Sequence, residues 1–128
     1  MPPTLSISDE EFEEIIGQAL DELPEEYVSR LLKHVVVTWD YEPSPAQREQ
    51  LKLRHNQSLF GLYEGLPLTH RYVGGDKMLP DKITIFKHTM LEHCHDMPAL
   101  RDQVKKTLWH EMAHYFGLNH AQIHELGG

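Results

Sequence analysis

The chain has 128 residues, of which 40% are hydrophobic and 25% are charged, and its formal net charge is −8. This composition is ordinary for a soluble globular protein, and the single cysteine excludes a disulfide framework within the chain. The acidic balance disfavours nucleic acid and anionic membranes as partners, because both are bound mainly through basic side chains. We therefore expect one domain over residues 1–128 that functions as a monomer.

No signals of export or membrane insertion are expected in this chain. Acidic residues at positions 9–11 precede any long apolar run, so no secretory signal is expected. No window approaches the roughly 18 apolar residues that a membrane span requires. A single cysteine suits a reducing compartment, and we expect a cytoplasmic protein.

Two amphipathic helices are predicted first along the chain. Ser8 and Glu11 have the spacing of a capping box, and apolar residues over 12–23 then recur at helical spacing. Pro24 interrupts this helix. A second, shorter helix is expected to run to about Lys33.

Three short segments have the composition of strands. Residues 35–39 are β-branched and aromatic and predict a buried strand. Residues 59–65 predict a second strand, whose glycines permit a bend or a close backbone approach. Residues 82–86 predict a third, with Ile83 and Ile85 on one face.

The connections are less regular. Residues 44–47 resemble a helix start, residues 73–77 a loop and residues 90–94 a short helical turn. Helices and strands do not alternate strictly along the chain. The expected class is therefore α+β, with a small sheet of three strands, or four, packed against helices.

A long helix is predicted after Pro98, which suits the first position of a helix. Its apolar residues form a broad stripe at helical spacing. The stripe comprises Leu100, Val104, Leu108, Trp109, Met112, Tyr115 and Phe116. His110 and His114 lie off this stripe, and Glu111 lies between the two sectors.

The end of this helix carries the motif with the clearest chemistry. Residues four apart on a helix lie about 40° apart around the axis and roughly 6 Å along it, so His110 and His114 can direct two imidazoles at one ion. Glu111 points about 100° away from His110, where it can hydrogen-bond a water on that ion. This arrangement predicts two metal ligands and a general base.

A third ligand is expected after the helix ends. Gly117 can adopt the left-handed conformation that terminates a helix and reverses the chain, which would bring His120 to the ion. His124, four residues further on, is the alternative third ligand. Three imidazoles and one open position are typical of a catalytic zinc site, so we expect one Zn²⁺ ion, although nickel, cobalt and copper also suit such ligands.

Four segments together resemble the small bacterial zincin-like metallopeptidases. They are residues 23–26 (LPEE), 61–65 (GLYEG), 79–83 (LPDKI) and 110–120 (HEMAHYFGLNH). The resemblance covers most of the chain and implies a reduced zincin fold, with His110, His114 and His120 as zinc ligands and Glu111 as the base. It differs at His120, because the third-ligand position is often acidic in this family.

The expected function is zinc-dependent hydrolysis of a peptide or protein substrate. Glu111 would take a proton from the attacking water and pass it to the leaving amine. Candidate oxyanion donors are Tyr63, Arg71 and Tyr115, each of which is more commonly structural. An extended substrate is expected to pair with an exposed sheet edge. The resemblance to zincins, in which an edge strand often precedes the metal helix, makes the strand at 82–86 the candidate.

Two other features have competing interpretations. Thr107 lies one turn before His110 and either supports a ligand or makes an ordinary backbone hydrogen bond. Residues 93–95 (HCH) contain metal-ligating types, but neighbours in an extended segment point to opposite sides.

The alternative to an enzyme is a non-catalytic metal-binding or peptide-binding module on a zincin scaffold. A third alternative is a structural domain without metal.

Overall fold

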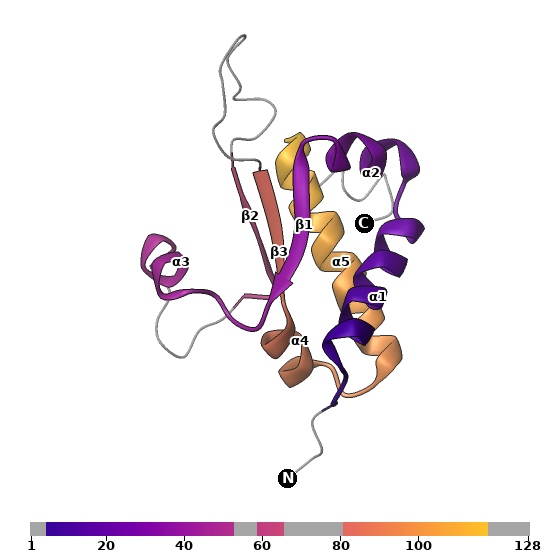
Figure 1. Cartoon of the computed structure of the whole chain (residues 1–128), viewed down its shortest axis with the longest axis vertical. Helices are drawn as coiled ribbons and strands as arrows, with labels where there is room; N and C mark the ends of the chain where they lie inside the picture. Colours follow the sequence, from indigo (N-terminus) through magenta and orange to yellow (C-terminus); the bar gives the residue numbers. More distant parts are fainter. Residues whose placement is uncertain (1–4, 53–58, 66–80, 118–128) are drawn as a thin grey trace.

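The structure is a computed structural model that describes residues 5–52, 59–65 and 81–117. Within these residues the chain forms helices and a small sheet in the expected α+β arrangement (Figure 1). In chain order the elements are α1 (Asp9–Glu22), α2 (Glu25–Leu32), β1 (Val35–Asp40), α3 (Pro45–Gln50), β2 (Gly61–Glu64), β3 (Asp81–Phe86), α4 (Lys87–His93) and α5 (Met97–Phe116).

The two N-terminal helices form for the predicted reasons. The Glu11 amide donates to Ser8 Oγ at 3.1 Å, and the Ser8 amide donates to Glu11 Oε1 at 3.2 Å, which completes the capping box of α1. Leu23 is extended because it precedes Pro24, and α2 begins directly afterwards. The buried side of α1 comprises Phe12, Ile15, Ile16 and Ala19.

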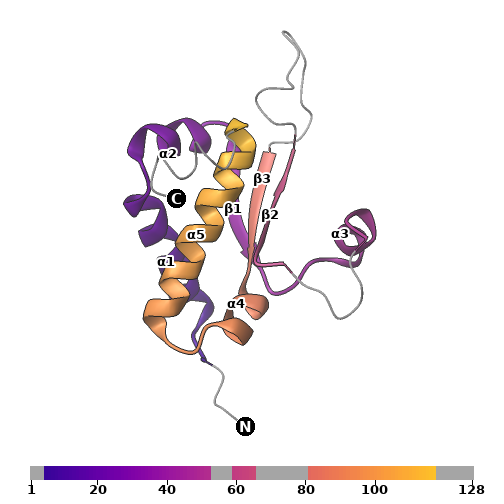
Figure 2. The same cartoon turned by 180° about the vertical axis from the view of Figure 1, so that it is seen from behind.

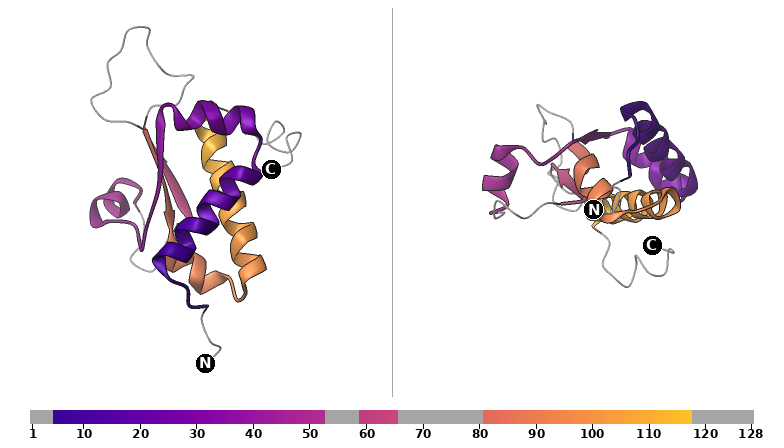
Figure 3. Two further views of the ribbon diagram at one scale, coloured as in Figure 1. Left: turned by 45° about the vertical axis from the view of Figure 1, so that its right-hand side comes forward. Right: turned by 90° about the horizontal axis from the view of Figure 1, so that it is seen from below.

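The three strands form one mixed sheet in the order β1-β3-β2. β1 is parallel to β3, with Val35 opposite Asp81, and β2 is antiparallel to β3, with Tyr63 opposite Ile83. Helices α1, α2 and α5 lie on one side of this sheet, and α3 lies on the other (Figure 3). The view from behind shows α5 running alongside β2 and β3 (Figure 2).

The predicted strand face is confirmed, but two strand positions are corrected. Ile83 and Ile85 are both fully buried on the helix side. Residues 35–39 were expected to be a buried strand, yet β1 is at one edge of the described sheet and Val36 is 48% exposed. The strand at 82–86 was expected to provide the edge for substrate, but β3 is central and β2 is the edge next to α5.

The two short helices were both predicted. α3 begins where it was expected, and α4 begins earlier than expected. Gln47 completes a capping box with Ser44, so the predicted helix start at 44–47 becomes α3. The predicted turn at 90–94 is α4, which follows β3 without a loop because Phe86 ends the strand and caps the helix. The predicted loop at 73–77 lies outside the described residues. None of the helices in the described ranges has the length and apolar character to cross a membrane.

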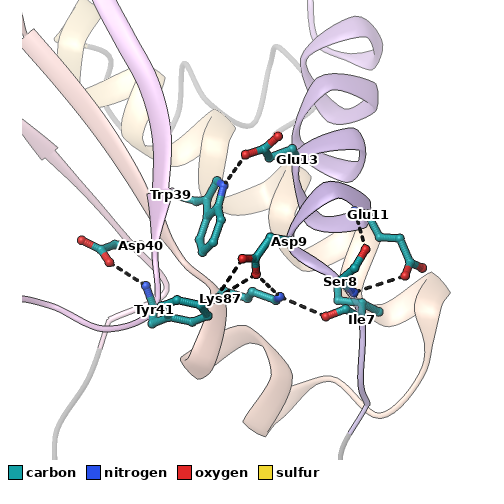
Figure 4. Close-up of polar contacts among 9 residues, drawn as sticks. All are labelled: Ile7, Ser8, Asp9, Glu11, Glu13, Trp39, Asp40, Tyr41 and Lys87. Atoms are coloured by element: carbon teal, nitrogen blue, oxygen red, sulfur yellow. Dashed lines mark hydrogen bonds and ion pairs between the residues drawn. The ribbon is translucent and has the colours of Figure 1, made fainter.

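A buried lysine fastens the start of the chain to the sheet (Figure 4). Lys87 Nζ donates to the Asp9 carboxylate at 2.8 Å and to the Ile7 carbonyl oxygen at 3.0 Å. Tyr41 OH also donates to Asp9, at 3.0 Å, and the ammonium lies 5.7 Å from the centroids of the Tyr41 and Trp39 rings. These contacts supply the partners that a buried ammonium requires.

This network predicts an acid-dependent contribution to stability. The Lys87 ammonium and the Tyr41 hydroxyl lower the pKa of Asp9 below its usual 3.8. A lowered folded-state pKa stabilises the protein above the unfolded pKa, and the contribution is lost as the pH falls through the folded value. We therefore expect Asp9→Asn to reduce the free energy of unfolding at pH 7, and its difference from the wild type to close as the pH falls through the lowered pKa of Asp9.

Urea denaturation at several pH values measures this difference. Asp21→Asn is the matched control, because Asp21 is an exposed carboxylate on the same helix. A difference for Asp9→Asn that stays constant from pH 7 to about pH 2 would show that the carboxylate charge contributes nothing.

Candidate metal centre

The helix that carries the motif has well-defined ends. Asp96 Oδ1 accepts from the Ala99 amide at 2.8 Å, and Pro98 occupies the first turn. At the other end Gly117 adopts φ 72° and ψ 27°, and its amide donates to the His114 carbonyl at 3.2 Å. The predicted left-handed helix end at Gly117 is therefore confirmed.

The last two turns of α5 bring together two imidazoles and a carboxylate. His110, Glu111 and His114 each offer one ligand atom, and these atoms all lie within 4.8 Å of one another. The two imidazole rings are 4.6 Å apart between centroids. Both histidines are exposed, whereas Glu111 is only 7% exposed.

This geometry fits two nitrogen ligands of one zinc ion. Zn–N bonds are about 2.0–2.1 Å long, so two nitrogens on one ion are separated by at most roughly 4 Å. The three candidate ligand atoms lie within 4.8 Å of one another, so a small rotation of the two exposed imidazole rings brings their nitrogens within that limit. His120 and His124, the predicted third ligand and its alternative, lie outside the described residues. No second cluster of three potential ligands occurs among the residues that the structure describes.

The Glu111 carboxylate is held from two directions. The Tyr63 amide of β2 donates to Glu111 Oε1 at 3.1 Å, and His114 Nδ1 lies 3.2 Å from the same oxygen. Both contacts use Oε1, so Oε2 remains for another partner. The sequence did not indicate the first contact, because its donor is a backbone N–H that lies 48 residues away along the chain.

Tyr63 is itself fixed by a buried acid. Its hydroxyl donates to Asp81 Oδ2 at 2.5 Å, and its ring packs edge-on against Tyr115. Asp81 is 1% exposed. Asp81 was missed as a supporting residue, although it shares the strand parity of Ile83 and Ile85, and this parity places it on the core side of β3.

β2 and α5 approach each other closely at Gly61. A Cβ atom on Gly61 would lie 2.6 Å from Thr107 Cγ2, so only glycine fits between the strand and the helix. Beyond this contact a cleft of about 400 Å³ separates the two elements and reaches His110 and Glu111. Its remaining lining comprises Leu59, Phe60, Gly61, Gln103, Lys106 and Thr107.

The other sequence-predicted candidates have different surroundings. Thr107 Oγ1 accepts a hydrogen bond from Gln103 Nε2 at 3.0 Å, and its support of a metal ligand stays a prediction. The hydroxyl of Tyr63 is engaged by Asp81, and Tyr115 is buried in the core, so neither side chain is placed as an oxyanion donor. Arg71 lies outside the described residues.

The HCH segment at 93–95 does not gather around one point. His93 Nδ1 is hydrogen-bonded to the Thr89 carbonyl oxygen at 2.9 Å. Cys94 is buried, and burial, together with the charges of Asp96 and Asp102, raises the pKa of its thiol. A protonated, buried thiol is a poor metal ligand.

Comparison with known proteins gives one family and one fold. The model of a family described as zincin-like metallopeptidase matches residues 32–128. A solved structure of a conserved hypothetical protein from Thermo thermophilus is similar, with 24% sequence identity and a TM-score of 0.58. The similarity covers 86% of this chain and 94% of that one, and it shows a shared fold. No curated protein matches the sequence.

Proposed function

Because the chain belongs to the zincin-like metallopeptidase family, we propose that it hydrolyses peptide bonds with one zinc ion bound by His110, His114 and His120. The observation that carries this proposal is the position of Glu111. Its carboxylate is buried directly beside two exposed imidazoles and at one end of a cleft. A purely structural metal site has no need for a base there.

The roles of the chain's own groups follow from this arrangement. A bound zinc ion would act as a Lewis acid that polarises the substrate carbonyl and activates water. Glu111 would accept the proton of the attacking water on Oε2 and return it to the leaving amine. The Tyr63 amide would hold Oε1, so that the base keeps one orientation during both transfers.

The edge of β2 is the place where an extended substrate would pair. The Phe86 amide donates to the Phe60 carbonyl at 2.9 Å, so the backbone groups of Phe60 point toward β3. In an antiparallel pair this direction alternates, and the backbone groups of Gly61 and Tyr63 therefore point outward. The Tyr63 amide is used by Glu111, which leaves the outward groups of Gly61 for a peptide backbone.

The test of this proposal combines metal analysis with turnover. We expect protein purified without a histidine tag to contain about one zinc ion per chain and to cleave members of a peptide library. Chelation should abolish cleavage, and added zinc should restore it. Zinc-loaded protein that cleaves no peptide would favour the non-catalytic binding module. Protein without bound metal after dialysis would exclude the zinc enzyme and a metal-binding module, and would favour the structural domain.

A further inference from the structure

The cleft between β2 and α5 has two walls of different chemistry. One wall is formed by Leu59, Phe60 and Gly61 and is apolar apart from its backbone. The other is a single face of α5, on which Gln103, Lys106 and Thr107 precede His110 and Glu111 at helical spacing. The cleft therefore extends from the candidate metal centre toward the N-terminal end of α5.

Strand direction determines which part of a substrate would occupy this cleft. A peptide antiparallel to β2 makes the more stable pairing and runs from the Glu64 end toward the Gly61 end. The segment after the bond to be cleaved then lies in the cleft, with Leu59 and Phe60 on one side and Lys106 on the other. Lys106 is four residues before His110, roughly 6 Å along the helix, which is about the length of two extended residues.

Lys106 is the one lysine or arginine among the described residues that line this cleft. Its Nζ lies 3.0 Å from Asp102 Oδ2, and both side chains are more than 60% exposed. An ion pair this exposed contributes little to stability, so a substrate carboxylate can replace Asp102 at low cost. The Gln103 amide donates one hydrogen to Thr107 and has a second for the same carboxylate.

We propose that Lys106 makes the cleft selective for a carboxylate carried within two residues after the bond to be cleaved, on either an acidic side chain or the chain terminus. This inference rests on the proposed function, because it assigns the substrate class of the same site. The net charge of −8 opposes anions at long range. That field is screened beyond about 8 Å at physiological ionic strength, whereas a contact with Lys106 is not.

Peptide binding to the Glu111→Gln variant, which lacks the proposed base, tests this selectivity separately from catalysis. Zinc-loaded Glu111→Gln protein is titrated with fluorescent hexapeptides in which Asp or Asn is scanned through each position. A second set compares free and amidated C-termini. We expect one or two adjacent positions at which Asp, or a free terminus, lowers the Kd about fivefold relative to the neutral form, an effect that weakens with salt.

Three further substitutions in the same background identify the residue responsible. Lys106→Met should abolish the preference, and Asp102→Asn should increase it by removing the competing carboxylate. Lys105→Met is the matched control, since Lys105 lies on the same helix but does not line the cleft, and the preference should survive. Equal affinity for the paired peptides, a preference that persists in Lys106→Met, or no peptide binding would overturn the inference.

Failure of this inference and failure of the proposed function give different results. If the wild type cleaves peptides without a carboxylate preference, the inference is wrong and the proposed function stands. If the preference is present but the wild type cleaves nothing, the cleft assignment stands and the proposed catalysis is wrong.

Discussion

Glu111→Gln is expected to lower kcat by about two to four orders of magnitude while leaving the fold and the metal content unchanged. Glutamine retains an oxygen that can accept the Tyr63 amide, so the contact between α5 and β2 is preserved. Its amide nitrogen cannot accept a proton from water. Steady-state kinetics on a peptide that the wild type cleaves, together with zinc analysis of both proteins, measures the effect.

Two further variants separate loss of the base from other causes. Glu22→Gln makes the same chemical change at an exposed position of α1 and should leave kcat unaltered. Glu111→Asp retains the charge but shortens the side chain by one methylene, which lengthens its 3.1 Å contact with Tyr63. We expect the kcat of Glu111→Asp to fall between those of Glu111→Gln and Glu22→Gln. A Glu111→Gln protein within about threefold of the wild-type kcat would mean that another group is the base.

Gly61→Ala is expected to reduce the free energy of unfolding by about 1–3 kcal/mol, as overpacking of a filled contact commonly does. The added methyl would lie 2.6 Å from Thr107 Cγ2 and 3.2 Å from the Thr84 carbonyl oxygen. β2 must therefore move away from α5, which lengthens the Tyr63 contact to the base. We expect turnover to fall together with stability, and urea denaturation and kinetics measure the two effects.

A second substitution should restore much of the stability that Gly61→Ala loses. Thr107→Ser removes Cγ2 but keeps the Oγ that accepts from Gln103. The double variant Gly61→Ala, Thr107→Ser should be more stable than the sum of the single effects predicts, with a coupling of about 0.5–3 kcal/mol. Additive losses would show that the contact between Gly61 and Thr107 does not limit the approach of β2.

The sequence predicted those parts of the site that depend on local geometry. His110, Glu111 and His114 belong to one helix, so their mutual placement follows from helical spacing, and Gly117 marked the helix end for a steric reason. The apolar periodicity of α1 and the β-branched strands gave the fold class in the same way. His120 as third ligand stays a prediction, because it lies outside the described residues.

The parts that depend on strand order could not be predicted. Alternation in residues 82–86 indicates which face of a strand is buried, but it does not indicate which strands become its neighbours. That limit explains why β3 was assigned to the edge and β2 was not. The contact of the Tyr63 amide with Glu111 could not be predicted either. Every residue except proline carries a backbone N–H, and no side-chain pattern marks this one.

The shared contact between Glu111 and Tyr63 links docking to reactivity. The strand that we propose as the edge for a peptide is also the strand whose Tyr63 amide holds the Glu111 carboxylate. A ligand that shifts this edge by a fraction of an ångström therefore redirects the carboxylate, whereas one that leaves the strand in register does not. Under the proposed function, peptides of equal affinity would then be cleaved at unequal rates, because the alignment of the peptide, rather than its affinity, would set the orientation of Glu111.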